Sequence, residues 1–160
     1  LCSMDILIEG VPLKAKIWDT AGSEKYMALN RNFYRGALGA MIIFDLTREI
    51  GKENIEKWIK ELREETKEDT CIILVGNKVD LNINPETTYF LREYAEDHSL
   101  RYFETSAKKG TGVDEAFEAL FVDVKKKHID TRGHIDNSSY SFKLSITQVD
   151  SGKSFPNCQC

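Results

Sequence analysis

Two short, continuous runs of apolar residues constrain the fold of this chain more than any other feature. They occupy residues 39–46 (GAMIIFDL) and 71–76 (CIILVG). Runs of this length are typical of strands that are buried on both faces, as in parallel sheets. Between them, Ile55, Ile59 and Leu62 recur at helical spacing and predict an amphipathic helix. The sequence therefore predicts a strand–helix–strand unit within a parallel sheet.

The segment before the first run is predicted to form a hairpin. Apolar and polar side chains alternate over residues 13–18, which predicts a strand with one solvent-exposed face. Ile6 and Ile8 predict a partner strand, joined to it by a turn at Glu9-Gly10. Further along the chain, residues 101–105 (RYFET) are a weaker strand candidate.

Two further helices are predicted after the second run. Pro85 stands at the start of one that extends to about His98, because the first helical turn tolerates proline. Residues 113–124 carry the clearest apolar stripe, and three lysines after it suit the helix C-terminal dipole. This alternation of strands and helices predicts an α/β fold with a doubly wound, mostly parallel sheet. Ligands bind such sheets at the carboxyl ends of the strands.

Composition and charge narrow the function classes. The chain has 160 residues, a formal net charge of −4 and 41% hydrophobic side chains. These values predict one folded domain that has no global attraction to nucleic acid. The longest apolar run, residues 37–44, is far shorter than the roughly 20 residues of a membrane-spanning helix. No secretory signal is visible, and the four cysteines form no CxxC pair, which argues against a zinc site.

The periodic pattern ends near residue 127. We therefore expect a domain over residues 1–127 and a flexible tail over residues 128–160, which is rich in Ser, Asn, Gly and Asp. Residues 142–146 (FKLSI) have the composition of a strand. A single unpaired strand is not expected to be stable, so the tail is predicted to stay outside the sheet.

Three polar motifs directly follow predicted strands. They are Trp18-Asp19-Thr20-Ala21-Gly22, Asn77-Lys78-Val79-Asp80 and Ser106-Ala107-Lys108. In this order and at these strand ends, over roughly residues 4–127, they resemble the Ras superfamily of small GTPases. The flanking residues 34–37 (YRGA), 75–78 (VGNK) and 104–108 (ETSAK) are most similar to the Rab branch. The resemblance implies a phosphate-loop NTPase-like G domain whose ligands are GDP or GTP and Mg²⁺.

The resemblance assigns guanine recognition to the second and third motifs. Guanine presents two neighbouring N–H donors on one edge, and the carboxylate of Asp80 can accept both. The family pattern further implies that the stem of Lys78 covers the base, that Asn77 joins the two loops, and that the backbone N–H of Ala107 meets the guanine carbonyl. A solvated turn is the alternative for an isolated NKVD sequence. The residues assigned to the nucleotide are Asn77, Lys78, Asp80, Ser106, Ala107 and Lys108.

The first motif resembles the second switch of these GTPases. Asp19 corresponds to the residue that holds a water of Mg²⁺, and Gly22 to the residue whose backbone N–H senses the γ-phosphate. Because Mg²⁺ keeps several waters, an acidic residue at a strand end suits it as an outer ligand. A turn or cap is the alternative role for a lone aspartate. Ordering of residues 23–33 by the phosphate would make this segment a switch.

Ser23 departs from the family pattern. The family usually has glutamine at this position, where it orients the attacking water. The serine hydroxyl is too short to take that place unaided, so we expect slow intrinsic hydrolysis unless a partner supplies the missing group. The alternative is that Ser23 is ordinary variation in a mobile loop.

No GxxxxGK[ST] sequence occurs in the chain. In the family this phosphate loop, with the first strand and helix, precedes the position of Leu1, so we expect an incomplete domain rather than a natural short protein. Losing roughly five hydrogen bonds to charged groups would cost about 8–15 kcal/mol, whereas nanomolar binding is worth about 12 kcal/mol. We therefore expect feeble nucleotide binding. We also expect two strand edges that are unpaired or that pair with each other.

The chain ends with Cys158-Gln159-Cys160. In Rab-type proteins a terminal C-x-C resembles the signal for two geranylgeranyl groups. One lipid gives only marginal membrane binding, whereas two anchor stably. We therefore expect a cytoplasmic protein that is reversibly attached to the cytosolic face of an endomembrane. A chance pair of terminal cysteines is the alternative.

The main functional hypothesis is a monomeric Rab-like GTPase that switches between GDP and GTP in vesicle traffic. The resemblance implies an exchange factor, a GTPase-activating protein, a prenylation escort, a GDP-dissociation inhibitor and effectors as partners. The alternative is a truncated remnant that binds nucleotide very weakly or not at all and acts only as a prenylated interaction module. A third hypothesis is an unrelated α/β domain with coincidental loops.

Overall fold

The structure is a computed structural model that describes residues 2–20, 34–130 and 140–149. In these residues the chain forms six strands, three α-helices and one π-helical turn. The strands are β1 (Cys2–Ile8), β2 (Val11–Thr20), β3 (Gly39–Asp45), β4 (Cys71–Asn77), β5 (Arg101–Thr105) and β6 (Tyr140–Val149). The helices are α2 (Lys52–Glu65), α3 (Pro85–Asp97) and α4 (Val113–Val124), and the π-helical turn is Lys125–Ile129.

All six strands form one sheet in the order β1-β2-β6-β3-β4-β5. β1 is antiparallel to β2, and every other neighbouring pair is parallel. The predicted hairpin is confirmed: β1 and β2 meet at a turn in which Glu9 and Gly10 have φ of 50° and 79°. Positive φ at both central residues is the geometry that suits the right-handed twist of a hairpin.

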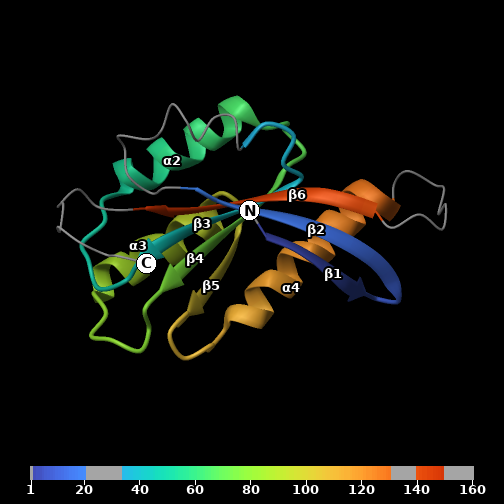
Figure 1. Cartoon of the computed structure of the whole chain (residues 1–160). Coiled ribbons are helices and arrows are strands. Elements are labelled where there is room, and N and C mark those ends of the chain that lie inside the picture. The colour runs from blue at the N-terminus through green and yellow to red at the C-terminus, as the bar shows by residue number, and fades with distance from the viewer. Residues whose placement is uncertain (1, 21–33, 131–139, 150–160) are drawn as a thin grey trace.

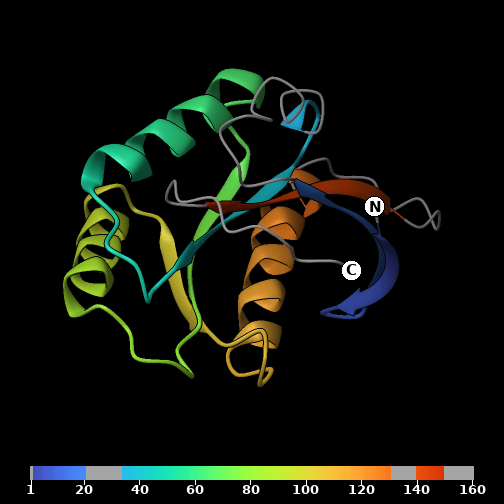
Figure 2. The same cartoon turned by 60° about the vertical axis from the view of Figure 1, so that its left-hand side comes forward.

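The helices cover both faces of the sheet (Figures 1 and 2). On one face α2 and α3 pack against alternate residues of β3, among them Ala40, Ile42 and Phe44. On the other face α4 packs against residues of β2, β3 and β4, including Met41. The period of two along β3 therefore divides its side chains between two cores. This arrangement confirms the predicted doubly wound α/β fold and places the two apolar runs in the sheet interior.

Helix α3 begins where the sequence predicts. The side chain of Asn84 accepts hydrogen bonds from the backbone N–H groups of Glu86, at 2.9 Å, and Thr87, at 3.2 Å. Pro85, the first helical residue, has no N–H to satisfy. Asn84 therefore caps the free donors of the first turn, and the helix ends at Asp97, one residue before the expected His98.

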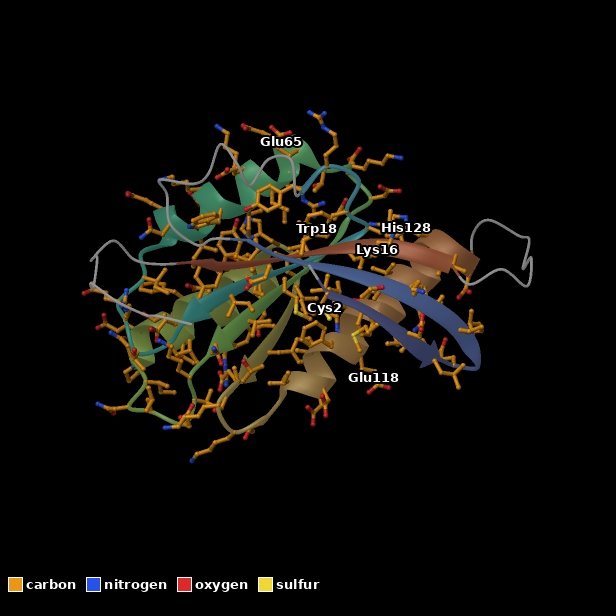
Figure 3. All side chains as sticks on the ribbon, in the orientation of Figure 1. Cys2, Lys16, Trp18, Glu65, Glu118 and His128 are labelled. Carbon is orange, nitrogen blue, oxygen red and sulfur yellow. The ribbon has the colours of Figure 1, made fainter. Side chains whose placement is uncertain are left out.

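The strand β6 lies between β2 and β3 and is parallel to both. Leu13 to Thr20 of β2 pair with Tyr140 to Thr147, and Gly39 to Phe44 of β3 pair with Leu144 to Val149. Figure 3 shows Lys16 and Trp18 on β2, the strand that borders β6. Residues 142–146 are expected from the sequence to be unstable as a single unpaired strand. In the structure they belong to β6, which pairs with a neighbouring strand on each side.

Two expectations are therefore wrong. Residues 140–149 are a central strand and not part of a flexible tail outside the sheet, and the edges of β2 and β3 are neither unpaired nor paired with each other. The expected boundary at residue 127 also falls inside a helical segment, because the π-helical turn continues to Ile129. Lys125 in this turn is buried and lies 2.8 Å from Glu9 and 3.3 Å from Asp130. The turn thereby ties α4 to the β1–β2 hairpin.

None of the described helices is long and apolar enough to span a membrane. The described cysteines, Cys2 and Cys71, are free thiols.

Candidate nucleotide site

The loops predicted to bind a nucleotide lie along one edge of the sheet. Because β2 to β6 are parallel, their carboxyl ends meet at the same edge. Asp19 is next to last in β2, Asp45 ends β3, Asn77 ends β4 and Thr105 ends β5. The structure therefore brings Asp19 and the Asn77 and Ser106 motifs together, as expected.

Asn77 joins the two loops that carry the predicted base-reading residues. Its Oδ1 accepts a hydrogen bond from the backbone N–H of Ala107 at 3.0 Å and one from the hydroxyl of Thr105 at 3.2 Å. The N–H of Ala107 is thus oriented by Asn77. A guanine carbonyl oxygen would have to share or replace this contact. Thr105 is buried, so the link is shielded from water on one side.

Asp80 and Ser106 form the second link between the loops. The buried hydroxyl of Ser106 donates to Oδ1 of Asp80 at 2.6 Å and accepts from the backbone N–H of Lys109 at 3.1 Å. The hydrogen bond from Ser106 lowers the pKa of Asp80, and the nearby charges of Lys108 and Lys109 act in the same direction. Asp80 is therefore held as an oriented carboxylate, which is the form that can accept two N–H donors.

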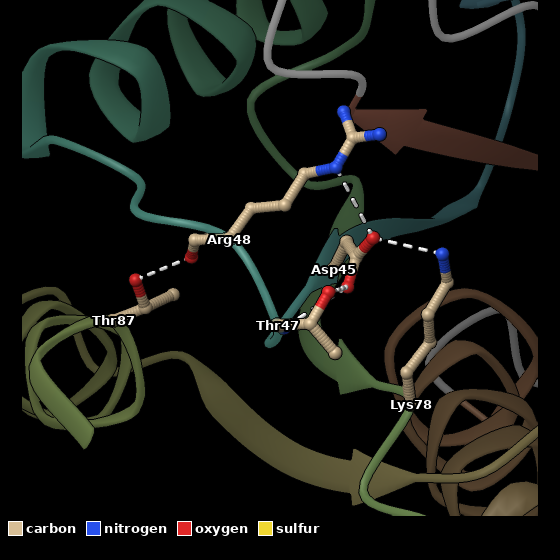
Figure 4. A network of polar contacts seen from close by, with 5 residues as sticks. All are labelled: Asp45, Thr47, Arg48, Lys78 and Thr87. Carbon is tan, nitrogen blue, oxygen red and sulfur yellow. Dashed lines mark hydrogen bonds and ion pairs between the residues drawn. The ribbon is translucent and has the colours of Figure 1, made fainter. Parts of the chain in front are cut away.

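Lys78 has an unusual backbone conformation, and its side chain forms an ion pair. Its φ is 74°, in the left-handed region that non-glycine residues rarely adopt. Its ammonium lies 2.8 Å from Oδ2 of Asp45 (Figure 4). The same oxygen forms an ion pair with Nε of Arg48 at 3.5 Å. The other oxygen of Asp45 accepts from the hydroxyl and the backbone N–H of Thr47, at 2.7 and 3.0 Å. The charge of Lys78 therefore points toward β3.

A cavity of about 360 Å³ opens at the same edge, between the strand ends and α4. Asp19, Asn77 and Thr105 are its polar lining residues, and the others are apolar or are the backbone of Ala107. Among the described residues that line it, Asp19 is the one charged side chain, and it is exposed to solvent. The cavity has room for part of a ligand, but its described wall repels anions rather than attracting them.

Asp19 fits the role of an outer ligand for Mg²⁺. It is an exposed carboxylate at a strand end, and the described residues contain no cluster of three or more acidic, histidine or cysteine side chains that could hold a metal alone. Mg²⁺ is commonly bound by one or two carboxylates together with phosphate oxygens and waters. Asp19 would hold the ion only together with such oxygens, and the ion would supply charge neutralisation at the phosphates.

Several predicted site residues lie outside the described residues. They are Gly22 and Ser23, assigned to the switch, and Cys158 and Cys160, assigned to lipidation. Lys108 is described and exposed at the rim of the site. The roles assigned to all of these residues stay predictions.

Sequence reasoning missed two described residues and one segment. Asp45 holds Lys78, and Thr105 shares the oxygen of Asn77 with Ala107. Both end strands that were predicted, so their position at the carboxyl edge was available as a signal. The segment is the C-terminal part of the chain, which supplies β6 to the same edge. Its signal was an alternating run whose partners are distant in sequence.

The fold and the site together define a nucleotide-binding α/β domain of the small-GTPase type. The sequence model of the Ras family matches residues 2–126, which is well over half of the chain. The chain therefore belongs to the Ras family. Members of this family are nucleotide-binding switches that bind GDP or GTP with Mg²⁺, hydrolyse GTP and respond to regulatory proteins.

Proposed function

We propose that this chain is a Rab-type guanine-nucleotide-binding switch that acts in membrane traffic. One observation carries the proposal: the Asn77 side chain accepts the backbone N–H of Ala107, at 3.0 Å, while Asp80 accepts the hydroxyl of Ser106, at 2.6 Å. These two bonds hold the loops after β4 and β5 in one fixed arrangement. A fixed pair of acceptor and donor groups is what a purine edge requires.

The proposal gives the individual groups the roles that the family resemblance implies. The oriented carboxylate of Asp80 accepts the ring N–H and the exocyclic amine of guanine. The N–H of Ala107 meets the carbonyl oxygen of the base, which shares or replaces its hydrogen bond to Asn77. The aliphatic stem of Lys78 covers one face of the base, while its ammonium stays with Asp45. Adenine offers no matching pair of donors to Asp80, so the site prefers guanine.

Hydrolysis and regulation belong to the same proposal. GTP hydrolysis proceeds by in-line attack of water on the γ-phosphate, with Asp19 supporting Mg²⁺ and with Gly22 sensing the phosphate. Ser23 leaves the attacking water poorly oriented, so intrinsic hydrolysis is slow. An exchange factor and a GTPase-activating protein then set the balance between the two nucleotide states, and effectors read it.

The C-terminal cysteines carry the membrane part of the proposal. Cys158 and Cys160 are the candidate positions for two prenyl groups. Two lipids give stable anchoring to the cytosolic face of an endomembrane. A prenylation escort and a GDP-dissociation inhibitor would deliver and extract such a protein. Incorporation of a labelled prenyl donor into the wild-type chain, and its loss in Cys158→Ser/Cys160→Ser, tests this part.

A nucleotide-independent interaction module is the second candidate. It is favoured by the cavity at the strand ends, whose described lining contains the anionic Asp19 and no cation. In that case the chain performs no hydrolysis and acts through its surface and its lipidated tail. The source of the phosphate contacts separates the two candidates. A transcript that encodes GxxxxGK[ST] ahead of residue 1 would favour the switch.

The decisive experiment measures base selectivity. Wild-type chain is titrated with GDP and with XDP up to millimolar concentration and followed by NMR. Asp80→Asn is expected to weaken GDP binding at least about tenfold, because one hydrogen bond to a charged group contributes about 1.5–3 kcal/mol. It is also expected to improve XDP binding, since xanthine has a carbonyl where guanine has its amine.

Asp97→Asn is the matched control, because Asp97 is an exposed aspartate at the end of α3. It should leave both affinities unchanged. Equal binding of GDP and XDP by the wild-type chain, or an Asp80→Asn variant with unchanged selectivity, contradicts the proposed base recognition. Absence of nucleotide binding at millimolar concentration supports the interaction module instead.

A further inference from the structure

Three of the five large apolar side chains that are exposed in the described residues lie within residues 81–90. They are Leu81, Tyr89 and Phe90, which are 51%, 62% and 41% exposed. The other two, Met4 and Leu7, lie on β1, at the opposite edge of the sheet from β5. Single exposed apolar residues are common on proteins, whereas a group of them marks an interaction site. The surface at the start of α3 is therefore a candidate docking site.

Ile83, Pro85 and Tyr89 line a shallow groove on this surface. Its volume is about 320 Å³, and Thr88 and Arg92 complete its lining. Nε and Nη2 of Arg92 lie 3.1 and 2.7 Å from Oε1 of Glu104 on β5, so the one charged group of the lining is already paired. The groove can therefore receive apolar side chains of a partner.

Backbone hydrogen bonds hold the segment that forms the groove. The N–H of Leu81 donates to the carbonyl of Lys78 at 3.0 Å, and the N–H of Asn84 donates to the carbonyl of Leu46 at 2.6 Å. The side chain of Asn84 also caps α3. A surface that is already ordered loses little conformational entropy when a partner binds to it.

The exposed side of α3 is negatively charged. Four exposed carboxylates lie on this helix: Glu86, Glu93, Glu96 and Asp97. The one cation of the helix is Arg92, whose charge Glu104 compensates. The hydroxyl of Tyr89 donates to Oε1 of Glu93 at 3.3 Å. The charge of Glu93 and this hydrogen bond raise the pKa of Tyr89, and two further carboxylates of the helix act in the same direction. Tyr89 therefore lies in a negative potential.

The aromatic rings complete a surface that is suited to cations. The rings of Tyr89 and Phe90 meet edge to face, with centroids 6.1 Å apart and an angle of 64° between their planes. The face of an exposed ring attracts an ammonium or guanidinium group, and nearby carboxylates act in the same direction. An apolar groove, two exposed rings and a row of carboxylates thus lie along one helix, which forms an outer side of the molecule (Figure 2).

The charge of this surface selects among the possible partners. In a symmetric pair of chains that meet through α3, the carboxylates of one copy would face the same carboxylates of the other. The anionic leaflet of a membrane would repel them as well. A segment that combines arginine or lysine with apolar side chains complements both the groove and the charge.

We propose that the α3 surface, formed by Leu81, Ile83, Pro85, Tyr89 and Phe90, docks a basic segment of a partner protein. Apolar side chains of the segment fill the groove, and its arginine or lysine residues contact the aromatic rings and the carboxylates of α3. This interaction uses no nucleotide and goes beyond the proposed switch function. Because Leu81 directly follows Asp80, the docked segment lies next to the base-reading loop.

Two fluorescein-labelled peptides of equal length test the proposal. One alternates arginine with leucine, and the other alternates glutamate with leucine. Each is titrated with the full 160-residue chain at physiological salt, and fluorescence anisotropy measures its affinity. The arginine peptide is expected to bind at least about tenfold more tightly and to shift the amide NMR signals of residues 81–93. Equal affinity for the two peptides, or no binding of the arginine peptide at millimolar concentration, overturns the proposal.

Substitutions on α3 test the aromatic part of the surface. Tyr89→Ser/Phe90→Ser is expected to weaken binding of the arginine peptide at least about tenfold, because two cation-binding rings are lost. Met4→Ser/Leu7→Ser is the matched control, since it removes the two exposed apolar side chains of β1. It should leave the affinity unchanged. Equal affinities of the two double variants overturn the proposal.

A second pair of variants tests the charges and keeps every aromatic side chain. Glu93→Gln/Asp97→Asn should weaken binding of the arginine peptide at least about threefold. Asp114→Asn/Glu118→Gln neutralises two exposed carboxylates on α4 and should leave the affinity unchanged. Equal effects of the two pairs would show that the total charge of the chain, and not the α3 surface, attracts the peptide.

The remaining occupants are separate outcomes of the same study. A peptide of arginine and serine that binds as tightly as the arginine–leucine peptide would show that the groove takes no part. Dimerisation of wild type that Tyr89→Ser/Phe90→Ser abolishes would assign the surface to a second copy. Binding to vesicles of anionic lipid that the same variant abolishes would assign it to a membrane. Each of these three results overturns the proposal.

Discussion

The ammonium of Lys78 lies 2.8 Å from the carboxylate of Asp45, and this ion pair ties the ends of β3 and β4 together beneath the candidate site. Asp45 is 6% exposed, so its charge depends on partners within the protein. Thr47 and Arg48 satisfy the rest of the carboxylate. The ion pair thus fixes the position of the loop Asn77-Lys78-Val79-Asp80, and the charge of Lys78 contributes to the stability of the fold.

Lys78→Met is expected to destabilise the fold. Methionine keeps an apolar stem but leaves a mostly buried carboxylate with one partner fewer, which costs about 1–3 kcal/mol. The free energy of unfolding in urea, followed by tryptophan fluorescence, measures the effect. Lys108→Met removes an exposed charge from the neighbouring loop and should change stability by less than about 0.5 kcal/mol. Equal effects of the two substitutions would contradict a structural role for the ion pair.

The same carboxylate predicts a pH dependence. Burial alone would raise the pKa of Asp45, but the hydrogen bonds from Lys78 and Thr47 outweigh it, so the folded pKa lies below the usual 3.8. A lowered pKa contributes stability that is fully present above the unfolded pKa and is lost as pH falls through the folded pKa. The stability difference between wild type and Asp45→Asn should therefore be constant from pH 7 to about pH 5 and shrink below about pH 4.

Urea unfolding of both proteins across this range checks the prediction, with Asp97→Asn as a control at an exposed position. A difference that stays constant down to pH 3, or that grows there, would show that ionisation of Asp45 does not stabilise the fold.

The link through Asn77 predicts a local effect on the loop after β5. Asn77→Ala removes the acceptor for the N–H of Ala107 and for the hydroxyl of Thr105. We expect a loss of about 1–3 kcal/mol and faster hydrogen exchange at the Ala107 amide. Exchange measured by NMR should be unchanged at that amide in Asn54→Ala, a substitution on α2. Unaltered protection of Ala107 in Asn77→Ala would argue that this contact does not hold the loops.

Hydrolysis tests the role of residue 23. Restoring the family's glutamine with Ser23→Gln is expected to raise the single-turnover GTP hydrolysis rate at saturating nucleotide by at least about tenfold, because the attacking water gains an orienting group. Ser23→Ala removes the hydroxyl without adding a longer side chain, so its hydrolysis rate should stay close to that of the wild type. Similar rates for all three proteins would favour ordinary variation at this position.

The strands β1 to β5 and the helices α2 to α4 could be predicted, because each one shows an alternating pattern, a short apolar run or an apolar stripe at helical spacing. Ile42 and Phe44 face one core and Met41 the other, as the unbroken apolar run of β3 requires. The position of the site loops at one edge of the sheet could be predicted as well, since the carboxyl ends of parallel strands share an edge. The ion pair between Asp45 and Lys78 could not be predicted, because it joins residues 33 apart through the conformation of one side chain.

The place of β6 could not be predicted either, for a different reason. Local composition indicates only that residues 142–146 can be extended. Their pairing depends on the edges of β2 and β3, whose paired residues all lie more than a hundred positions earlier in the chain. The alternation of apolar and polar residues over 142–146 also differs from the continuous apolar run that a central strand usually shows. Tertiary pairing here overrides local preference.

The central position of β6 gives the last prediction. Ser145 pairs with Trp18 of β2 and Ala40 of β3, so its backbone lies inside the sheet. Ser145→Pro removes an N–H from a central ladder, which proline does not tolerate, and should destabilise the fold by at least about 2 kcal/mol. Ser145→Ala keeps the N–H and should cost much less. Urea unfolding measures both, and limited proteolysis should cleave the C-terminal segment faster in the proline variant alone. If both variants unfold and are cleaved like wild type, residues 140–149 do not form the central strand.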